Sequence, residues 1–377
     1  MRPIQMVDLK QQYAKIKSEV DSAIQDVLDN ASFIQGKAVT DFAAGLSAYT
    51  GSRHTIPCAN GTDALQIAMM ALDLQPGDEV ITPSFTYVAT TEVVALLRLK
   101  PVFVEVDPKT FCMDPYSLEK AITPKTRAIV PVHLYGQSAP MEEILRIAGQ
   151  HGLYVIEDNA QAIGSQYTFA DGTTKKTGTL GIIGTTSFFP SKNLGCYGDG
   201  GAIFTDDDTL AGKLKMIANH GQSKRYYHDL VGCNSRLDSI QAAVLNVKLK
   251  NLDDYILSRR RAADHYDHSF ANHPKITTPY RASYSHHVFH QYTLILEGVD
   301  RNGLNEWLAA KDIPSMIYYP VPAHRQKMFA AFGGASYQLA TTDWLTERVI
   351  SLPMHTELDE DQLQYISSSV LEYINRI

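Results

Sequence analysis

Cysteines are few in this sequence, and Cys58, Cys112, Cys196 and Cys233 are scattered, with no C-x-x-C pair. This pattern excludes a disulfide framework and argues against a cysteine-based zinc site. An uncharged apolar run of about 18 residues is also absent, so no membrane-spanning helix is expected. The N-terminal stretch lacks the apolar core of a signal peptide. We therefore expect a protein of the reducing cytoplasm.

Basic residues are in the minority. The chain has 34 Lys and Arg against 41 Asp and Glu, which gives a formal net charge of -7 and a pI near 6.0. Because nucleic acids and anionic membrane surfaces attract basic proteins, this balance argues against both as partners. With 377 residues, 44% of them hydrophobic, the chain is long enough for two domains and a large core.

Apolar runs alternate with helical patterns along most of the chain. Near-continuous apolar runs predict buried strands at 79–82, 101–106, 128–134, 153–158 and 202–205. Apolar residues at helical spacing predict helices at 9–28, 38–49, 65–72, 141–150 and from Asp238 onward. This alternation is typical of an α/β fold with a mostly parallel sheet, in which ligands bind beyond the carboxyl ends of the strands.

The last part of the chain predicts a smaller unit of mixed helices and strands. Its patterns predict strands at 288–294 and 316–319, and helices near 304–308 and at 363–374. We therefore expect a large domain at 1–250 and a small α+β domain at 251–377. The charged stretch 248–267 is interpreted as a solvated linking helix, and its basic run Ser258–Arg261 as part of the exposed face.

Lys192 follows a stretch that can shield an amine from water, since Phe188, Phe189 and Pro190 precede it. A free lysine has a pKa near 10.4, so a nucleophile near neutral pH needs a pKa lower by about 3, roughly 4 kcal/mol. Burial supplies part of that change. The stretch is compatible with a covalent lysine, and also with a solvated lysine beside the glycine-rich turn 195–201.

Asp158 ends a predicted buried strand, where a carboxylate needs a cation or several hydrogen-bond donors. It is compatible with a helix cap, a metal ligand or the partner of a ligand cation, although no nearby spacing completes a metal site. Gln161 offers a neutral donor in the same loop, and Tyr87 lies in an analogous loop, where it either packs or contacts a ligand. The histidines between 286 and 290 are interpreted as packing or polar ligand contacts, because no carboxylate or cysteine completes a metal site.

Two helix starts carry recognisable signals. Thr62 or Asp63 is the expected N-cap of the helix predicted at 65–72. Free N–H groups at such a start can bind an anion, but an ordinary capped helix has the same pattern. Asp238 and Gln241 are expected to form a capping pair at a later helix.

Several motifs together resemble those of one enzyme family. They are Asn60-Gly-Thr62, Gly77-Asp-Glu-Val-Ile-Thr-Pro-Ser84, Glu157-Asp-Asn-Ala-Gln161, Ser187-Phe-Phe-Pro-Ser-Lys192, Gly198-Asp-Gly-Gly201 and Asn234-Ser-Arg-Leu-Asp238. Their order and spacing are similar to those of the DegT/DnrJ/StrS family of sugar-nucleotide aminotransferases. The resemblance covers nearly the whole chain and implies the α/β fold of type I pyridoxal phosphate (PLP) enzymes, with a smaller α+β C-terminal domain.

The resemblance implies how PLP would be held. Lys192 would bind the cofactor covalently and move protons, Asp158 would pair with its ring nitrogen, and Gln161 would hydrogen-bond its ring hydroxyl. Tyr87 would stack on the ring.

The resemblance also implies the phosphate contacts and the assembly. Gly61, Thr62 and Ser187 would hold the cofactor phosphate. Asn234 would reach the phosphate of a neighbouring subunit's cofactor, so a homodimer with shared active sites is expected.

The same resemblance implies the reaction. L-Glutamate would give its amino group to PLP, forming pyridoxamine phosphate (PMP), and a nucleotide-linked keto sugar would accept it. The phrases at 188–199 and 218–228 are most similar to those of enzymes that aminate UDP-linked 2-acetamido-3-keto-glucuronic acid for lipopolysaccharide or a related surface polysaccharide. Arg236, His324 and Arg325 are candidates for the carboxylate and diphosphate of such a substrate.

Alternatives remain at this point. Relatives with histidine in place of the lysine are dehydratases, so Lys192 favours amino transfer. The acceptor is alternatively a dTDP-linked 3-keto or 4-keto deoxysugar, and a non-catalytic regulatory protein would share the fold. Residues 166–179 are longer than in many relatives; an extra hairpin there would leave the chemistry intact but reshape the sugar pocket.

Overall fold

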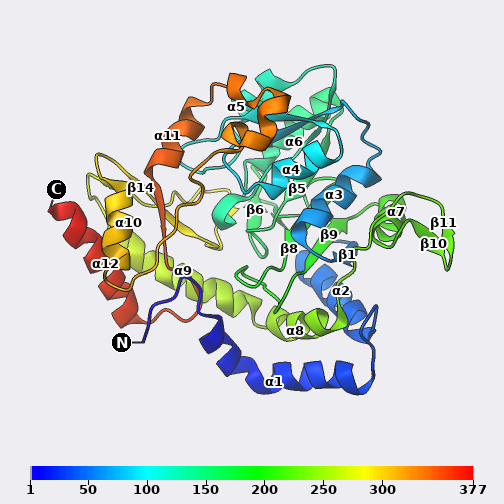
Figure 1. Cartoon of the computed structure of the whole chain (residues 1–377), viewed down its shortest axis with the longest axis horizontal. Helices are drawn as coiled ribbons and strands as arrows, with labels where there is room; N and C mark the ends of the chain where they lie inside the picture. The colour runs from blue at the N-terminus through cyan, green and yellow to red at the C-terminus, as the bar shows by residue number, and fades with distance from the viewer. Residues whose placement is uncertain (1, 377) are drawn as a thin grey trace.

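A seven-stranded sheet forms the centre of the structure, a computed structural model that describes residues 2–376 (Figure 1). In spatial order its strands are β1 (His54–Cys58), β9 (Gly201–Thr205), β8 (Ile183–Ser187), β5 (Tyr154–Asp158), β4 (Thr126–Ile129), β2 (Glu79–Pro83) and β3 (Lys100–Val104). Only β9 runs against its neighbours. The predicted α/β fold with a mostly parallel sheet is confirmed.

Helices cover both faces of this sheet. Successive strand residues enter different apolar layers, as the pleat requires: Val155 packs on one face and Ile156 on the other. One layer includes residues of α5 (Pro115–Ala121) and α6 (Met141–His151). The other includes residues of α3 (Gly61–Ala71), α4 (Ala89–Leu96) and α7 (Asp208–Ala218). Burial on both faces explains why consecutive residues are apolar in strands such as β3 and in the first part of β5.

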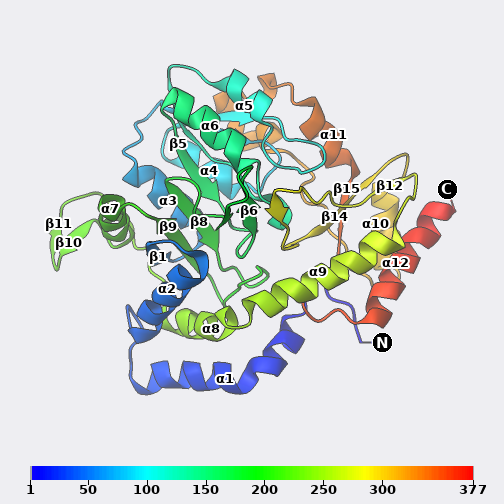
Figure 2. The ribbon, with the colours of Figure 1, turned by 180° about the vertical axis from the view of Figure 1, so that it is seen from behind.

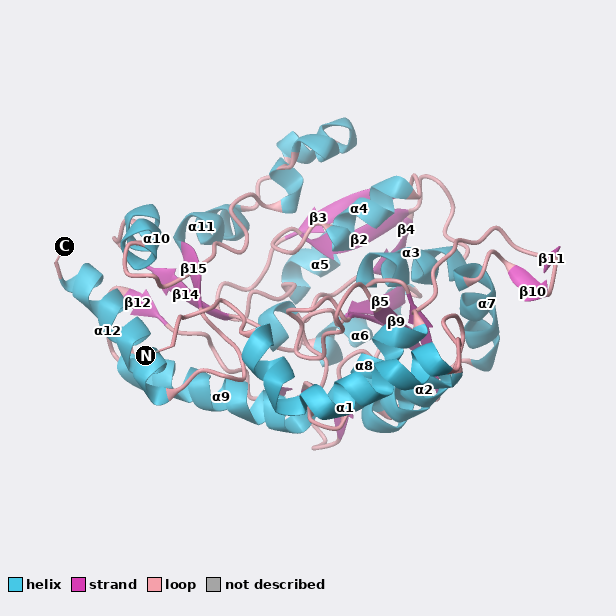
Figure 3. Cartoon of the chain, turned by 60° about the horizontal axis from the view of Figure 1, so that its bottom comes forward, coloured by secondary structure: helices cyan, strands magenta, loops and turns pink. Residues whose placement is uncertain are grey.

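Three helices form a further layer beside the sheet. These are α1 (Leu9–Asp29), α2 (Lys37–Thr50) and α8 (Ser239–Leu249), and α8 packs against the other two (Figure 3). All three occur where helices were predicted. The predicted capping pair at α8 is wrong, because the Asp238 side chain makes no cap hydrogen bond and Gln241 instead accepts one from the Tyr197 N–H at 2.9 Å.

The long helix α9 (Leu252–Ser269) leads to a second apolar core (Figure 2). This core lies between an antiparallel sheet and helices that include the expected C-terminal one. The strands are β12 (Ile276–Thr277), β14 (Tyr292–Leu296) and β15 (Val349–Leu352), and the helices include α10 (Arg301–Ala309) and α12 (Glu360–Asn375). A further helix, α11 (Ala340–Arg348), precedes β15. The C-terminal part is α+β as predicted, while the boundary near residue 250 stays a prediction.

Four local predictions are wrong. The strand predicted at 288–294 begins only at Tyr292, because Phe289 has a positive φ of 47°. The strand predicted at 128–134 ends at Ile129, and residues 316–319 make only a single bridge, between Met316 and Ser351. In the basic run thought to be exposed, Arg259 is buried and donates to three backbone carbonyls.

The segment 166–179 forms a hairpin of β6 (Gln166–Thr168) and β7 (Thr174–Lys176). The first strand of the hairpin, β6, also pairs with β13 (Ser285–His286), which joins the hairpin to the segment before β14. A second hairpin, β10 (Gln222–Lys224) with β11 (Tyr227–His228), projects from the edge of the molecule (Figure 1). None of the helices between residues 2 and 376 combines the length and apolar character needed to cross a bilayer.

Candidate active site

The candidate residues meet at one edge of the central sheet. The parallel strands β1, β5 and β8 end there at Cys58, Asp158 and Ser187, and the reversed strand β9 begins there at Gly201. Gly201 is in register with both Cys58 and Ser187. The loop 188–200, which carries Lys192, therefore lies beside Asp158 and the start of α3, as the strand order predicts.

The loop around Lys192 is tightly folded. The Lys192 N–H donates to the Phe189 carbonyl at 2.8 Å, and the Cys196 N–H donates to the Phe188 carbonyl at 2.8 Å. Only glycine fits at 195, since a Cβ there would lie 2.4 Å from the Pro190 carbonyl oxygen. Phe188 is buried, as expected for a residue that shields the amine, whereas Phe189 is 52% exposed and does not do so.

Lys192 has the electrostatics of a nucleophile. Burial lowers its pKa to about 8, and the nearby negative charge of Asp158 acts against that fall. Its Nζ makes no hydrogen bond within residues 2–376, so the amine is free to react. Burial, and after it the charge of Lys192, lowers the pKa of the adjacent His290, which is therefore neutral.

Asp158 is held at the carboxyl end of β5 with both oxygens engaged. The Thr90 hydroxyl donates to its Oδ2 at 2.7 Å, and the Ala160 N–H donates to its Oδ1 at 3.1 Å. The carboxylate is buried, and each oxygen keeps a lone pair for a further donor. Sequence reasoning missed Thr90, which lies in the first turn of α4.

Gln161 lies one turn beyond Asp158 and is also buried. Its Oε1 accepts from the Tyr135 N–H at 2.8 Å, and its Nε2 donates to the Tyr319 hydroxyl at 2.9 Å. The second Nε2 hydrogen remains available for a ligand. Tyr319 was not recognised as a site residue, because residues 316–319 were interpreted as a strand.

Tyr87 borders the same region from the loop after β2. It is 57% exposed, and its ring centroid lies 6.2 Å from that of Tyr319. An exposed aromatic face beside buried polar groups suits a planar ligand.

The start of α3 forms a cradle with the end of β8. Asn60, and not Thr62 or Asp63, is the N-cap: its side chain accepts from the Asp63 N–H at 2.8 Å. The helix therefore begins at Gly61, and the Gly61 and Thr62 N–H groups have no partner within residues 2–376. A Cβ on Gly61 would lie 2.7 Å from the Ser187 Cβ and would fill this cradle. Free N–H groups at a helix start beside a serine hydroxyl suit a phosphate.

In the described part of the chain, none of the hydrogen bonds and ion pairs of the other candidate residues involves Lys192. Asn234 is exposed in the loop before α8, and Arg236 donates to the Asn219 Oδ1 at 3.0 Å. His324 is 1% exposed and hydrogen-bonds Ser84 through Nδ1 at 2.7 Å. Both His324 and Arg325 also pair with Asp343.

This arrangement suits a ligand with three chemical features. Lys192 offers an amine for a carbonyl group, Asp158 a carboxylate for a ring cation, and the Gly61 cradle a set of donors for a phosphate. These are the features of PLP, so the residues present fit that cofactor. Among residues 2–376, no group of three or more His, Cys, Asp or Glu side chains is placed to hold a metal ion.

Comparison with known proteins agrees with this chemistry. The profile of the DegT/DnrJ/EryC1/StrS aminotransferase family matches residues 14–371. UDP-2-acetamido-2-deoxy-3-oxo-D-glucuronate aminotransferase of Pseudomonas aeruginosa is 46% identical over 97% of this chain and 99% of its own. UDP-N-acetyl-3-dehydro-alpha-D-glucosamine 3-aminotransferase of Acidithiobacillus ferrooxidans is 46% identical over 97% of each chain. A pleiotropic regulatory protein of Geobacillus stearothermophilus is 45% identical over 98% of each.

Solved structures share the fold and indicate the cofactor. A DegT/DnrJ/EryC1/StrS aminotransferase from Brucella abortus superposes with a TM-score of 0.92 at 39% identity, covering 98% of this chain and 99% of its own. NtdA from Bacillus subtilis, solved with bound PMP, has a TM-score of 0.89 at 30% identity, covering 98% of this chain and 83% of its own. The chain therefore belongs to the DegT/DnrJ/EryC1/StrS aminotransferase family, as a PLP-dependent aminotransferase of sugar nucleotides.

Proposed function

We propose that the enzyme transfers the amino group of L-glutamate to the 3-keto position of a UDP-linked 2-acetamido-2-deoxy-glucuronic acid. The observation that carries this proposal is the 46% identity, over nearly the whole length of both chains, to the Pseudomonas aeruginosa enzyme named for that reaction. The net charge of -7 makes a local cationic group necessary for an anionic substrate. A role in surface polysaccharide synthesis, such as that of lipopolysaccharide, in the cytoplasm follows from that substrate.

Three side chains act on the reacting end of the site. Lys192 holds PLP covalently and, when released, moves a proton between cofactor and substrate carbons; a pKa near 8 suits a group that must both accept and donate near neutral pH. Asp158 keeps the ring nitrogen protonated, and Gln161 donates to the ring hydroxyl. PLP, once bound, supplies the electron-withdrawing ring that lets the amino group leave and enter.

The remaining cofactor contacts place the ring and its phosphate. Tyr87 stacks on the ring, and Gly61, Thr62 and Ser187 bind the phosphate at the α3 cradle. Asn234, exposed on its own subunit, completes the phosphate site of a second subunit. The active enzyme is then a homodimer in which each site uses residues of both chains.

Arg236 is the main candidate for binding the anionic groups of the substrate. Its guanidinium makes one hydrogen bond, to Asn219, and so keeps donors for a carboxylate or diphosphate. His324 and Arg325 already share Asp343, so they contact the substrate only if that pairing is rearranged.

A panel of keto-sugar nucleotides, assayed with L-glutamate as donor, tests the proposal. We expect the UDP-3-keto-glucuronic acid to give the highest kcat/KM, and Arg236→Lys to reduce kcat/KM for it by about tenfold or more, because a bidentate contact is lost. A higher kcat/KM with a neutral sugar, unaffected by R236K, would refute the uronate assignment.

A second candidate acceptor is the UDP-linked 3-keto-N-acetylglucosamine. The equal identity of 46% to the Acidithiobacillus ferrooxidans enzyme favours it as much as it favours the uronate. The dTDP-linked 3-keto and 4-keto deoxysugars remain in the panel as further alternatives. A regulatory role, suggested by the 45% identical Geobacillus protein, would have to operate beside catalysis.

A further inference from the structure

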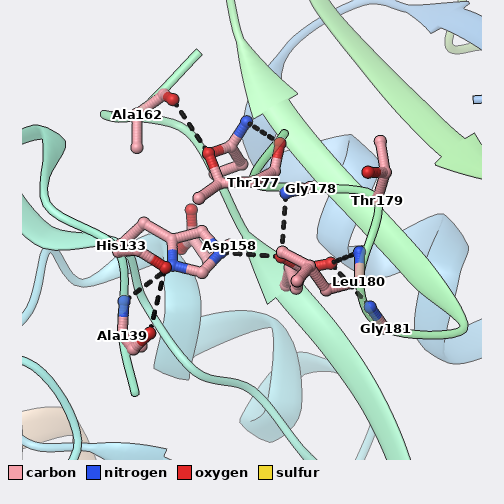
Figure 4. A network of polar contacts seen from close by, with 12 residues as sticks. His133, Ala139, Asp158, Ala162, Thr177, Gly178, Thr179, Leu180 and Gly181 are labelled. Atoms are coloured by element: carbon pink, nitrogen blue, oxygen red, sulfur yellow. Dashed lines mark hydrogen bonds and ion pairs between the residues drawn. The ribbon is translucent and has the colours of Figure 1, made fainter. Parts of the chain in front are cut away.

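Glu157, the residue before Asp158, has a fully buried carboxylate. Its hydrogen-bond donors come from His133 and from the loop residues Gly178, Leu180 and Gly181, which Figure 4 labels. Its Oε1 accepts from the N–H groups of Leu180 and Gly181, at 2.6 and 2.7 Å. Its Oε2 accepts from the Gly178 N–H at 2.8 Å and from His133 Nε2 at 2.8 Å. Four donors on one carboxylate satisfy its lone pairs and hold it in one orientation.

The hydrogen bonds also fix the state of His133. The Ala139 N–H donates to His133 Nδ1 at 3.0 Å, so that nitrogen carries no proton. The ring proton therefore lies on Nε2 and points at Glu157, and the imidazole is neutral. The main chain of the same histidine donates to the Asp158 carbonyl at 3.1 Å, so His133 is bonded to both residues of the Glu157-Asp158 pair.

The residue on the other side of Asp158 holds the same loop. Asn159 Nδ2 donates to the Thr177 carbonyl at 3.0 Å, and the Thr177 hydroxyl donates to the Ala162 carbonyl at 3.0 Å. The loop 177–181 lies so close to β5 that a Cβ on Gly181 would come within 2.5 Å of the Val155 carbonyl oxygen. Asp158 thus lies between two neighbours that are both fastened to one closely packed loop.

From this geometry we propose that Glu157 is a positioning residue for Asp158. Neighbouring side chains on a strand point to opposite faces, so the network on the Glu157 side fixes the direction in which the Asp158 carboxylate faces. A change of about 1 Å in such a group is costly, because a charged contact in a water-poor site depends on its geometry. The inference rests on the proposed pairing of Asp158 with the cofactor ring.

Glu157→Gln tests the proposal, because the amide keeps the size of the side chain but turns an NH2 group toward backbone N–H donors. Glu105→Gln is a matched control: Glu105 accepts from the N–H groups of Thr341 and Thr342 and from the Thr342 hydroxyl, at the start of α11. We expect both variants to lower the melting temperature. Only E157Q should weaken PLP binding, by about tenfold or more, and change the pH dependence of the bound cofactor's absorbance.

Equal PLP affinity and equal absorbance profiles in E157Q and E105Q would overturn the proposal, since Glu157 would then only stabilise the fold. If E157Q does not fold, His133→Gln replaces it in the same comparison of PLP affinity and absorbance. This variant removes the histidine donor from the Glu157 carboxylate and leaves its three backbone donors in place. Asp158→Asn separates this inference from the proposed function. If D158N itself leaves the cofactor's absorbance unchanged, the proposed role of Asp158 fails; if D158N changes it and E157Q does not, only the positioning role fails.

Discussion

Lys192 and Lys248 have the same lowered pKa, about 8, for the same reason, which is burial. Their contacts differ. Lys248 is 1% exposed, donates from Nζ to the Gly195 carbonyl at 2.7 Å and lies over the Tyr197 ring. The Lys192 Nζ makes no hydrogen bond within residues 2–376. A lowered pKa therefore does not identify the reactive lysine in this protein; the free Nζ beside Asp158 does.

Asp158→Asn is expected to lower the pKa of Lys192 below about 8 in the cofactor-free protein, because the carboxylate charge stabilises the ammonium form. The measurement is the pH dependence of acylation at Lys192, followed by mass spectrometry. Asp199→Asn, in an exposed residue of the same loop, is the control and should leave the profile unchanged. A rise in the midpoint with D158N would show that this charge does not act on Lys192.

Lys248→Met is expected to destabilise the protein by about 1–3 kcal/mol, because the buried Gly195 carbonyl loses its donor. The loss should grow as the pH rises through about 8 toward 10.5. In that window the folded protein has released the Lys248 proton and the unfolded chain has not. The wild-type protein therefore becomes more stable as the pH rises, and the variant, which lacks the amine, does not. Urea unfolding at several pH values measures the difference from wild type. Lys250→Met, at an exposed site, should show no such trend.

At the scale of elements, the hairpin β6–β7 and the loop 177–181 are adjacent in sequence but differ in their attachment. The hairpin pairs with β13, whereas the loop is fastened to β5 through Glu157 and Asn159. We therefore expect the structural effect of a change in hairpin length to end at the loop 177–181 and not to reach Asp158.

Replacing residues 169–173 with Asn-Gly, a two-residue turn between Thr168 and Thr174, should leave PLP affinity within about twofold of wild type. Some stability is lost, because Phe169 packs against Tyr167 at a centroid distance of 5.0 Å. Absorbance titration with PLP and thermal unfolding measure the two effects. A large loss of PLP affinity in a folded variant would show that the hairpin does act on the cofactor site.

At the scale of the whole molecule, the chain offers only part of the proposed site. Lys192, Asp158 and the α3 cradle meet at one sheet edge, while Asn234 is exposed in the loop before α8. The proposed homodimer accounts for that separation.

Subunit mixing tests the dimer. Lys192→Ala and Asn234→Ala are each expected to be nearly inactive, and refolding them together should restore about a quarter of wild-type activity, since half the dimers are mixed and each has one intact site. The assay is glutamate-dependent amino transfer, with each variant alone as control. No recovery in a mixture shown to contain heterodimers would contradict shared sites.

The amino-acid sequence determined the α/β class, most helices and the order of the motifs, because periodic burial and glycine or helix-cap signals are local properties of the chain. It also predicted Lys192, Asp158 and Gln161 as site residues, and they remain a prediction. Only the tertiary structure decided which charges are buried, because burial depends on what packs against a residue: Lys248 and Arg259 belong to a charged pattern that predicted exposure. Packing likewise brought Thr90 to Asp158 and Tyr319 to Gln161, because these partners come from distant parts of the chain.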